Sequence, residues 1–251
     1  MDHAIYTAMG AARQTLEQQS VTANNLANAS TPGFRAQLLA LRAVPVAGPS
    51  VPTRTLVAAS TPGVDLRQGP LNYTERPLDV ALQQDGFLVV SQPDGSEAYS
   101  RNGNIQISAT GQLIVQGRPL LGDGGPIDVP PQAQLTIAAD GTISALNPGD
   151  PPNTLAQIGR LKLVKAAAFE VIRGDDGLFH LSAATQQQRG TTLPNDPQVR
   201  VMPGVLEGSN VKPTETMVEM IANARRFEMQ MQVIQSVDEN AQRANAVLAM
   251  S

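Results

Sequence analysis

The sequence contains no cysteine and no tryptophan, and aromatic residues make up only 3% of its 251 positions. Without cysteine, a disulfide framework, a thiolate nucleophile and a cysteine-ligated metal site are excluded. No run approaches the roughly 20 apolar residues that a membrane-spanning helix needs. The first residues, Met1–Tyr6, also lack the basic and apolar regions of a secretory signal peptide. We therefore expect a protein that starts in the cytoplasm and that would leave it without a cleaved signal peptide.

The net charge is small, and few residues are of the types that carry out catalysis or bind metals. A net charge of −4 provides no basic footprint for nucleic acid. Of the two histidines, neither has a second histidine at ligand spacing, and His180 alternates with apolar neighbours, as a solvent-facing strand residue does. The run Asp175–Gly177 indicates a hairpin turn, because it lacks the alternating oxygen ligands of a Ca²⁺ loop. We expect no catalytic residue, no cofactor and no metal.

The C-terminal stretch carries the strongest pattern. A helix should begin within residues 210–216 and run nearly to the end, because Pro213 is tolerated in a first turn and no proline or glycine follows. Apolar or small residues recur mostly at alternating steps of three and four, which is the seam of a coiled coil. With Ile221 beside them, the assembly candidates on this helix are Met217, Met220, Ala224, Phe227, Met231, Ile234, Val237, Ala241 and Leu248. The irregular step from Ile234 to Val237 predicts a change of partner or of local winding.

The N-terminal stretch carries a second, similar pattern that cannot continue past Pro32. Its assembly candidates are Ile5, Met9, Ala12, Leu16, Ala23 and Leu26. The two helices either close a globular domain by packing on its core, or pair with each other and with copies from neighbouring subunits. The small residues of the N-terminal seam favour close but weak packing, which suits an assembly better than an isolated hairpin.

The middle of the chain is rich in strand and turn signals. Residues 36–75 form an extended connector with a short strand expected at 54–57, because proline recurs every few residues. From about residue 76, short apolar runs alternate with Asp-Gly or Asn-Gly pairs, which fit tight turns. One hairpin is expected about Asp140 and Gly141, and further strands are expected at 87–90, 104–108, 112–116, 159–165, 178–182 and 199–207.

These patterns predict an α+β protein that is mostly β. A central domain of short antiparallel strands, sandwich- or barrel-like, would span residues 76–207. Long N- and C-terminal helices, within 1–35 and 208–251, would form a discontinuous coiled-coil-like inner domain, and 36–75 would connect the two.

Two terminal motifs resemble signatures of the bacterial flagellar rod and hook proteins. The N-terminal motif consists of Asn25, Leu26, Ala27, Asn28, Thr31, Gly33 and Phe34, followed by Arg35. The C-terminal motif contains Leu206, Glu207, Ser209, Asn210 and Val211. Segments 77–82, 85–90 and 99–104 resemble the family's central segments in the same order, so the resemblance spans essentially the whole chain. Its length and middle are most similar to proximal rod members, and Gln83 and Gln84 stand where relatives usually have a glycine-rich run.

The resemblance implies a structural subunit of the flagellar basal-body rod, in the periplasm-spanning axial structure. Terminal helices of such subunits self- and co-assemble into a tube that transmits torque and encloses the export channel. The implied partners are proximal and distal rod subunits, further copies of the chain and the flagellar export apparatus, without nucleic acid or membrane insertion. The alternatives are a distal rod or hook-type axial protein, an adhesive or carbohydrate-binding β module, against which the absence of tryptophan counts, and a β-rich hydrolase, which would need a cleft with convergent acids.

Overall fold

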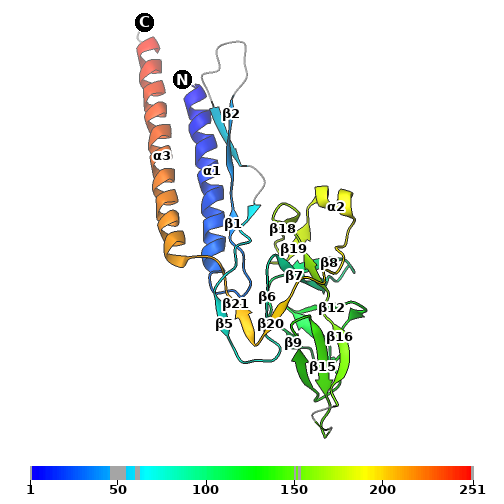
Figure 1. Cartoon of the computed structure of the whole chain (residues 1–251). Coiled ribbons are helices and arrows are strands. Elements are labelled where there is room, and N and C mark those ends of the chain that lie inside the picture. The colour runs from blue at the N-terminus through cyan, green and yellow to red at the C-terminus, as the bar shows by residue number, and fades with distance from the viewer. Residues whose placement is uncertain (1, 46–54, 60–62, 150, 152–153, 250–251) are drawn as a thin grey trace. The chain divides into compact units, whose positions relative to one another are not determined.

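The computed structural model describes residues 2–45, 55–59, 63–149, 151 and 154–249 (Figure 1). The described chain is a mixture of helix and strand that is mostly β, with many short antiparallel strands. It divides into two compact units. The helical unit comprises Met1–Ala27, Gln37–Gly63 and Lys212–Ser251, and the β unit comprises Asn28–Ala36 and Val64–Val211. Among the described residues, no helix is both long enough and apolar enough to cross a membrane.

The helical unit is built on α1 (Asp2–Ala27) and α3 (Pro213–Ala249), which contact each other along their lengths (Figure 1). The predicted start of the C-terminal helix within 210–216 is confirmed, because α3 begins at Pro213, where a missing backbone donor is tolerated. In the predicted connector, β2 (Leu41–Pro45) pairs with β3 (Thr55–Ala59), and β3 contacts α1. The short strand expected at 54–57 overlaps β3, but residue 54 lies outside the described residues. The helical unit also contains β1 (Gln37–Leu38), and β4 (Gly63–Val64) spans the division between the two units in the sequence.

The β unit is organised around a five-stranded antiparallel sheet. Its strands, in spatial order, are β17 (Leu163–Lys165), β7 (Gly86–Ser91), β8 (Glu97–Ser100), β19 (Phe179–Leu181) and β18 (Val171–Arg173). Alternate side chains of β7 enter two different apolar clusters: Leu88 and Val90 belong to one, and Phe87 and Val89 to the other. The sheet is therefore covered on both faces at β7, which explains why this strand is an uninterrupted apolar run.

Smaller sheets and one short helix complete the β unit. The three-stranded sheets are β9 (Gln106–Ile107), β10 (Leu113–Val115) and β11 (Arg118–Pro119), and β14 (Gln134–Ile137), β15 (Thr142–Leu146) and β16 (Ala156–Arg160). The strand pairs are β5 (Leu71–Tyr73) with β21 (Val205–Glu207), β6 (Val80–Leu82) with β20 (Val201–Pro203), and β12 (Leu121–Gly122) with β13 (Gly125–Pro126). The helix is α2 (Ala183–Arg189). The sandwich- or barrel-like closure expected from the sequence stays a prediction.

The local turn signals were good guides to this topology. The hairpin about Asp140 and Gly141 is confirmed, because β14 and β15 pair across it from Ile137↔Ile143 outward. The pair at 102–103 is not a hairpin turn; its glycine carbonyl instead accepts a hydrogen bond from the backbone of Val80. A single strand at 199–207 is wrong, because Gly204 adopts φ +73° and separates β20 from β21.

Two further departures have local causes. The predicted strand at 159–165 is divided into the end of β16 and β17, which pair with different neighbours. Helix α2 was not predicted, because its seven glutamine-rich residues have no apolar periodicity. The available signal was Ser182, whose side chain accepts a hydrogen bond from the backbone N–H of Thr185 as an N-cap.

Candidate functional site

Buried positions are regularly spaced along the face of α3 that lies against α1. Buried and half-buried positions recur at alternating steps of four and three; they are Thr216, Met220, Asn223, Phe227, Gln230, Ile234, Val237, Ala241 and Ala244. Ala222, beside Asn223, is also half-buried. On α1, from residue 5 onward, the buried side chains are Ala12, Thr15 and Thr22. An average spacing near 3.5 residues keeps one narrow stripe of a helix turned toward the same neighbour.

This inner stripe is polar at its best-buried positions. Gln230 Nε2 donates a hydrogen bond to Thr15 Oγ1 at 3.0 Å, and Asn223 Nδ2 donates to Thr22 Oγ1 at 3.4 Å. Asn223 is 1% exposed and Thr22 4% exposed. A buried polar group left without its partner costs about 1–3 kcal/mol, so these two pairs favour one register of α1 against α3.

The residues that the sequence assigned to assembly divide into two groups. Ala12 is buried, and those that are half-buried are Ile5, Leu26, Met220, Phe227, Ile234, Val237 and Ala241. Those that are exposed are Met9, Leu16, Ala23, Met217, Ile221, Ala224 and Met231, and the side chain of Leu248 lies outside the described part of the chain. Sequence periodicity selected apolar residues, whereas Thr15, Thr22 and Asn223 occupy inner positions. An assembly role for either group stays a prediction.

The irregular step between Ile234 and Val237 has a simple structural explanation. Helix α3 is continuous through these residues, and both lie on the inner stripe with the spacing that holds from Thr216 onward. The expected change of local winding is therefore wrong, and the alternative, a change of partner, stays a prediction. The irregularity arose from assigning Met217, Ala224 and Met231 to the seam in place of their polar neighbours.

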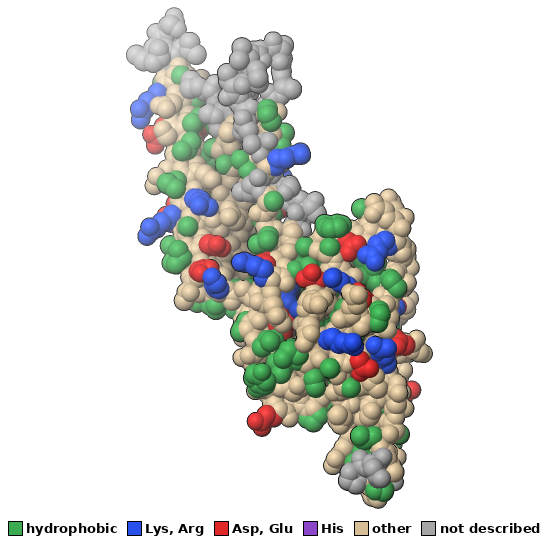
Figure 2. All heavy atoms as spheres, viewed as in Figure 1, with side chains coloured by type: hydrophobic (Ala, Val, Ile, Leu, Met, Phe, Trp, Pro, Cys, Tyr) green, Lys and Arg blue, Asp and Glu red, His purple; other side chains and the backbone are tan. Residues whose placement is uncertain are grey.

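The outer surfaces of both helices carry large apolar side chains. On α1 they are Tyr6, Met9 and Leu16, and on α3 they are Met217, Val218, Ile221, Met229, Met231 and Val233, all between 39% and 67% exposed. Hydrophobic side chains are visible along this part of the surface in Figure 2. The helix pair thus places some polar residues on its inner stripe and leaves many large apolar side chains exposed, which is typical of a surface that another protein covers.

The N-terminal motif stabilises the chain around the end of α1. Within the helical unit, the Asn25 side chain donates to the carbonyl of Gln37 at 3.0 Å and accepts from its N–H at 2.9 Å. Within the β unit, the backbone N–H of Thr31 donates to the Asn28 carbonyl at 3.1 Å. Asn25 therefore holds the strand that returns after the motif, and Asn28 and Thr31 form a turn.

The two motifs meet at a buried charge cluster, which consists of Arg35, Arg101 and Glu207. Glu207 Oε1 accepts from Arg35 Nη2 at 2.5 Å and Oε2 accepts from Arg101 Nη2 at 2.8 Å, and all three side chains are at most 2% exposed. The backbone N–H of Gly69 also donates to Glu207 at 3.0 Å. Burial lowers the pKa of Arg101, and the Glu207 carboxylate opposes this effect. Segments distant in sequence thus converge on one carboxylate.

Backbone contacts reinforce this meeting of the motifs. Gly33 N–H donates to the Glu207 carbonyl at 2.8 Å, and Ala36 N–H donates to Asn210 Oδ1 at 2.8 Å. Asn210 Nδ2 in turn donates to the carbonyls of Asp65 and Arg67. Segment 33–36 is therefore hydrogen-bonded to the C-terminal motif at both ends.

Phe34 is held by a residue that the sequence did not single out. Its ring is 2% exposed, and the guanidinium carbon of Arg173 lies 3.8 Å from the ring centroid. Arg173 also donates a hydrogen bond to the carbonyl of Arg35 at 3.4 Å. A cation stacked on a buried aromatic face stabilises the docked motif. Neither this contact nor the use of Arg101 could be located from spacing, because both residues are distant in sequence from the motif that they touch.

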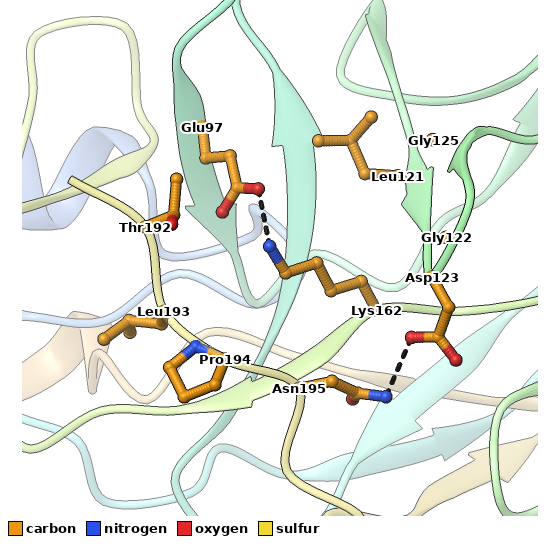
Figure 3. Close-up of a pocket in the computed structure, with 10 residues that line it drawn as sticks. All are labelled: Glu97, Leu121, Gly122, Asp123, Gly125, Lys162, Thr192, Leu193, Pro194 and Asn195. Carbon is orange, nitrogen blue, oxygen red and sulfur yellow. Dashed lines mark hydrogen bonds and ion pairs between the residues drawn. The ribbon is translucent and has the colours of Figure 1, made fainter. Parts of the chain in front are cut away.

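The β unit also has an open pocket of about 530 Å³, which Figure 3 shows with its lining residues. Glu97 points to Lys162, and their charged atoms are 2.5 Å apart, while Asp123 points to Asn195 at 2.8 Å (Figure 3). The two carboxylates thus engage separate partners, and the lining contains no serine, cysteine or histidine. The convergent acids that a hydrolase requires are not present in this pocket.

Metal-ligating groups are similarly dispersed. Across the described residues, no cluster of three or more His, Asp or Glu side chains could hold a metal ion. His180 alternates with buried Phe179 and Leu181, as predicted, and its ring nitrogen contacts the Asp176 carboxylate at 3.1 Å. The extensive contacts of the two motifs are therefore the best-supported functional features of the chain.

Family models match three separate parts of the chain. The C-terminal model of flagellar basal body rod FlgEFG proteins matches residues 202–247, and the D1 domain model of flagellar hook proteins FlgE/F/G matches residues 81–145. The flagella basal body rod protein model matches residues 5–35. These matches include both terminal motifs and part of the β unit.

Full-length relatives agree with these models. The chain is 71% identical to the flagellar basal-body rod protein FlgF of Salmonella typhimurium and 70% identical to that of Escherichia coli, in each case over 100% of both chains. It is 30% identical to the flagellar basal-body rod protein FlgG of Buchnera aphidicola from Schizaphis graminum, over 89% of this chain and 91% of that protein. The chain therefore belongs to the FlgF family of flagellar basal-body rod proteins and is a structural subunit of the bacterial flagellum rather than an enzyme.

Proposed function

We propose that the chain is a proximal rod subunit whose terminal helices form part of the inner wall of the axial tube. In this arrangement the terminal helical domain, residues 1–35 with 208–251, packs in coiled-coil fashion against equivalent helices of neighbouring subunits. The β-rich domain, residues 76–207, forms the outer layer, and residues 36–75 connect the two. The tube transmits torque and encloses the export channel, which the chain itself uses to leave the cytoplasm without a cleaved signal peptide.

The observation that carries this proposal is the set of large apolar side chains that the helix pair leaves exposed. The inner stripe of α3 mixes Thr, Asn and Gln with apolar residues, whereas the outer surface exposes Met217, Val218 and Ile221 at 50%, 67% and 56%. Apolar burial contributes about 25 cal/mol per Å², so these side chains gain most when neighbouring subunits cover them. Methionine adapts to irregular gaps, which suits contacts that differ between neighbours in a helical lattice.

The partners that this surface suits are the helices of other rod proteins and of further copies of the chain. A surface that contacts a different surface on the next subunit generates a ring or an open helical tube rather than a closed dimer. The flagellar export apparatus is the expected partner during secretion. These assignments rest on family membership together with the exposed apolar side chains of α1 and α3.

The test changes the outer surface without changing the inner stripe. We expect the triple variant Met217→Gln, Ile221→Gln, Met231→Gln to keep the helical signal and the unfolding midpoint of the purified chain, because glutamine has a good helix propensity and these positions are exposed. In cells without the wild-type copy, it should be absent from isolated basal bodies and motility should be lost.

The matched control replaces two exposed polar residues of the same helix, Gln232→Ala and Gln235→Ala. This variant should enter basal bodies normally and support motility. If the triple variant also incorporates and swims like the wild type, the outer surface of α3 does not mediate assembly and the proposal is wrong.

A further inference from the structure

The buried charge cluster of Arg35, Arg101 and Glu207 holds two cations and one anion. Their side chains are 0%, 2% and 0% exposed, respectively. Three of the guanidinium nitrogens, Nε and Nη1 of Arg35 and Nε of Arg101, are buried without a hydrogen-bond partner among the described residues. Glu207 is therefore the carboxylate that forms ion pairs with both arginines. Asp85 and Asp65 also attract Arg101 and Arg35, respectively, but without forming an ion pair among the described residues, so removal of the Glu207 charge would leave two adjacent buried cations without a paired carboxylate.

The two arginines depend on Glu207 to different degrees. Arg101 donates from Nη1 to the carbonyls of Gln84 and Gly86 at 2.6 Å each, and from Nη2 to the carbonyl of Leu82 at 3.3 Å. These three backbone carbonyls therefore hold Arg101 in place independently of Glu207. The side chain of Arg35, in contrast, has Glu207 as its only hydrogen-bond acceptor within the described chain.

Arg35 and Glu207, the pair on which this difference depends, lie near opposite ends of the chain. Arg35 belongs to segment Asn28–Ala36, which follows α1 directly, whereas Glu207 lies in the C-terminal motif, shortly before α3. Burying a guanidinium without its carboxylate is strongly unfavourable. Arg35 has to stay in water until Glu207 is in place, since Arg101 alone would repel it.

We propose that Glu207 makes docking of segment Asn28–Ala36 on the rest of the β unit conditional on docking of the C-terminal motif. The segments that anchor α1 and α3 then dock together or not at all. A chain whose C-terminal motif is missing, not yet synthesised or displaced does not anchor α1. Only the connection to assembly rests on the proposed function, because the conditional docking itself is a property of the isolated chain.

The first test measures hydrogen exchange in the full-length variant Glu207→Gln. Glutamine keeps the size of the side chain and its acceptor for Gly69, but it removes the charge. The amides of Gly33 and Ala36, which report docking through their bonds to the C-terminal motif, should exchange at least about 100-fold faster. Amides of the central strand β7 should keep their protection.

The second test removes one of the two positive charges that Glu207→Gln leaves without a paired carboxylate. Adding Arg35→Met to Glu207→Gln removes the uncompensated cation from the N-terminal segment, so the double variant should regain at least about tenfold protection at Gly33 and Ala36 relative to Glu207→Gln alone. If Glu207→Gln acted only by removing an ordinary structural contact, the opposite result is expected: a second substitution in the same cluster would lower protection further.

Glu170→Gln is the matched control, because Glu170 forms an ion pair with Arg189, which is 41% exposed. It should leave protection at Gly33 and Ala36 unchanged. The proposal is overturned if Glu207→Gln changes that protection by less than about threefold, or if the double variant is no better protected than Glu207→Gln. Should Glu207→Gln unfold the whole β unit, the same rescue by Arg35→Met is required. Normal incorporation of the triple α3 variant would defeat the assembly role while leaving these results intact.

Discussion

Gly33 provides the sharpest quantitative test of how the N-terminal motif docks. It adopts φ +67°, and a Cβ atom added there would lie 2.4 Å from both the carbonyl carbon and the oxygen of Arg101, and 2.5 Å from the backbone nitrogen of Asn102. All three are backbone atoms, which cannot rotate away as a side chain would. Gly33→Ala therefore combines a strained backbone with a collision.

The expected loss of stability in Gly33→Ala is the sum of the backbone strain and the collision. A left-handed conformation costs a residue with a Cβ about 1–2 kcal/mol, and forcing an extra carbon into a well-packed site costs about 1–3 kcal/mol. We expect Gly33→Ala to destabilise the docked motif by about 2–5 kcal/mol. Gly95→Ala isolates the first term, because Gly95 has φ +83° and no atom within 4 Å of the added carbon; it should lose about 1–2 kcal/mol.

Two measurements separate these variants. Urea unfolding followed by the tyrosine near-ultraviolet signal reports the free energy of unfolding of the β unit, and hydrogen exchange at Ala36 reports local undocking of the motif. Gly124→Ala, with no positive φ and no neighbour within 4 Å, sets the baseline and should stay within about 0.5 kcal/mol of the wild type. If Gly33→Ala and Gly95→Ala show equal losses in both measurements, the close approach to Arg101 contributes nothing and the reasoning fails.

Three further predictions concern other parts of the chain. Phe87 is fully buried and its ring lies 5.2 Å from that of Phe179, so Phe87→Ala should lower the free energy of unfolding in urea by about 3–5 kcal/mol; a loss below 1 kcal/mol would contradict its place in the core. Burial raises the pKa of Tyr99 from 10.0 to about 12, so its contribution to stability is complete below pH 10 and is lost as the pH rises toward 12. The urea midpoint should therefore fall more steeply across that range in the wild type than in Tyr99→Phe, and equal slopes would refute this. Asn223→Ala removes the hydrogen bond from α3 to Thr22, whose hydroxyl still donates to the carbonyl of Gln18, and it leaves a gap at a position that is 1% exposed. It should reduce the stability of the helix pair by about 1 kcal/mol, measured by thermal circular dichroism; an unchanged or higher midpoint would contradict the inner stripe.

The features that were predictable from the sequence are those with local causes. Proline is tolerated in the first turn of a helix but not in its interior, so Pro213 could mark the start of α3 and Pro32 the limit beyond which α1 cannot extend. The pair Asp140 and Gly141 forms its turn through the conformations available to those two residues alone. The resemblance to rod and hook proteins depended on residue identity and spacing, and it too was readable from the sequence.

Which face of each long helix is buried was harder to predict from the sequence. Hydrophobic periodicity selects the apolar stripe of a helix, but on α3 the most buried stripe includes Thr216, Asn223 and Gln230. Asn223 and Gln230 are accepted inside because side chains of α1 form hydrogen bonds with them, as Thr15 does with Gln230. Thr216 instead donates to the carbonyl of Lys212. No pattern within one helix reveals such a partner, so the predicted seam included exposed residues such as Met217.

The roles of the motif residues also required the folded chain. Sequence identified Gly33, Arg35 and Glu207 as members of two signatures, and backbone chemistry alone assigned them to turns and strands. Only the tertiary structure places Glu207 between Arg35 and Arg101, which are 172 and 106 residues away from it. Secondary structure follows from interactions over a few residues, whereas the pairing of buried charges depends on which distant segments share one interior. In this chain, interactions over a few residues determine where helices and turns form. Contacts between distant segments determine which side chains hold the N-terminal and C-terminal motifs together.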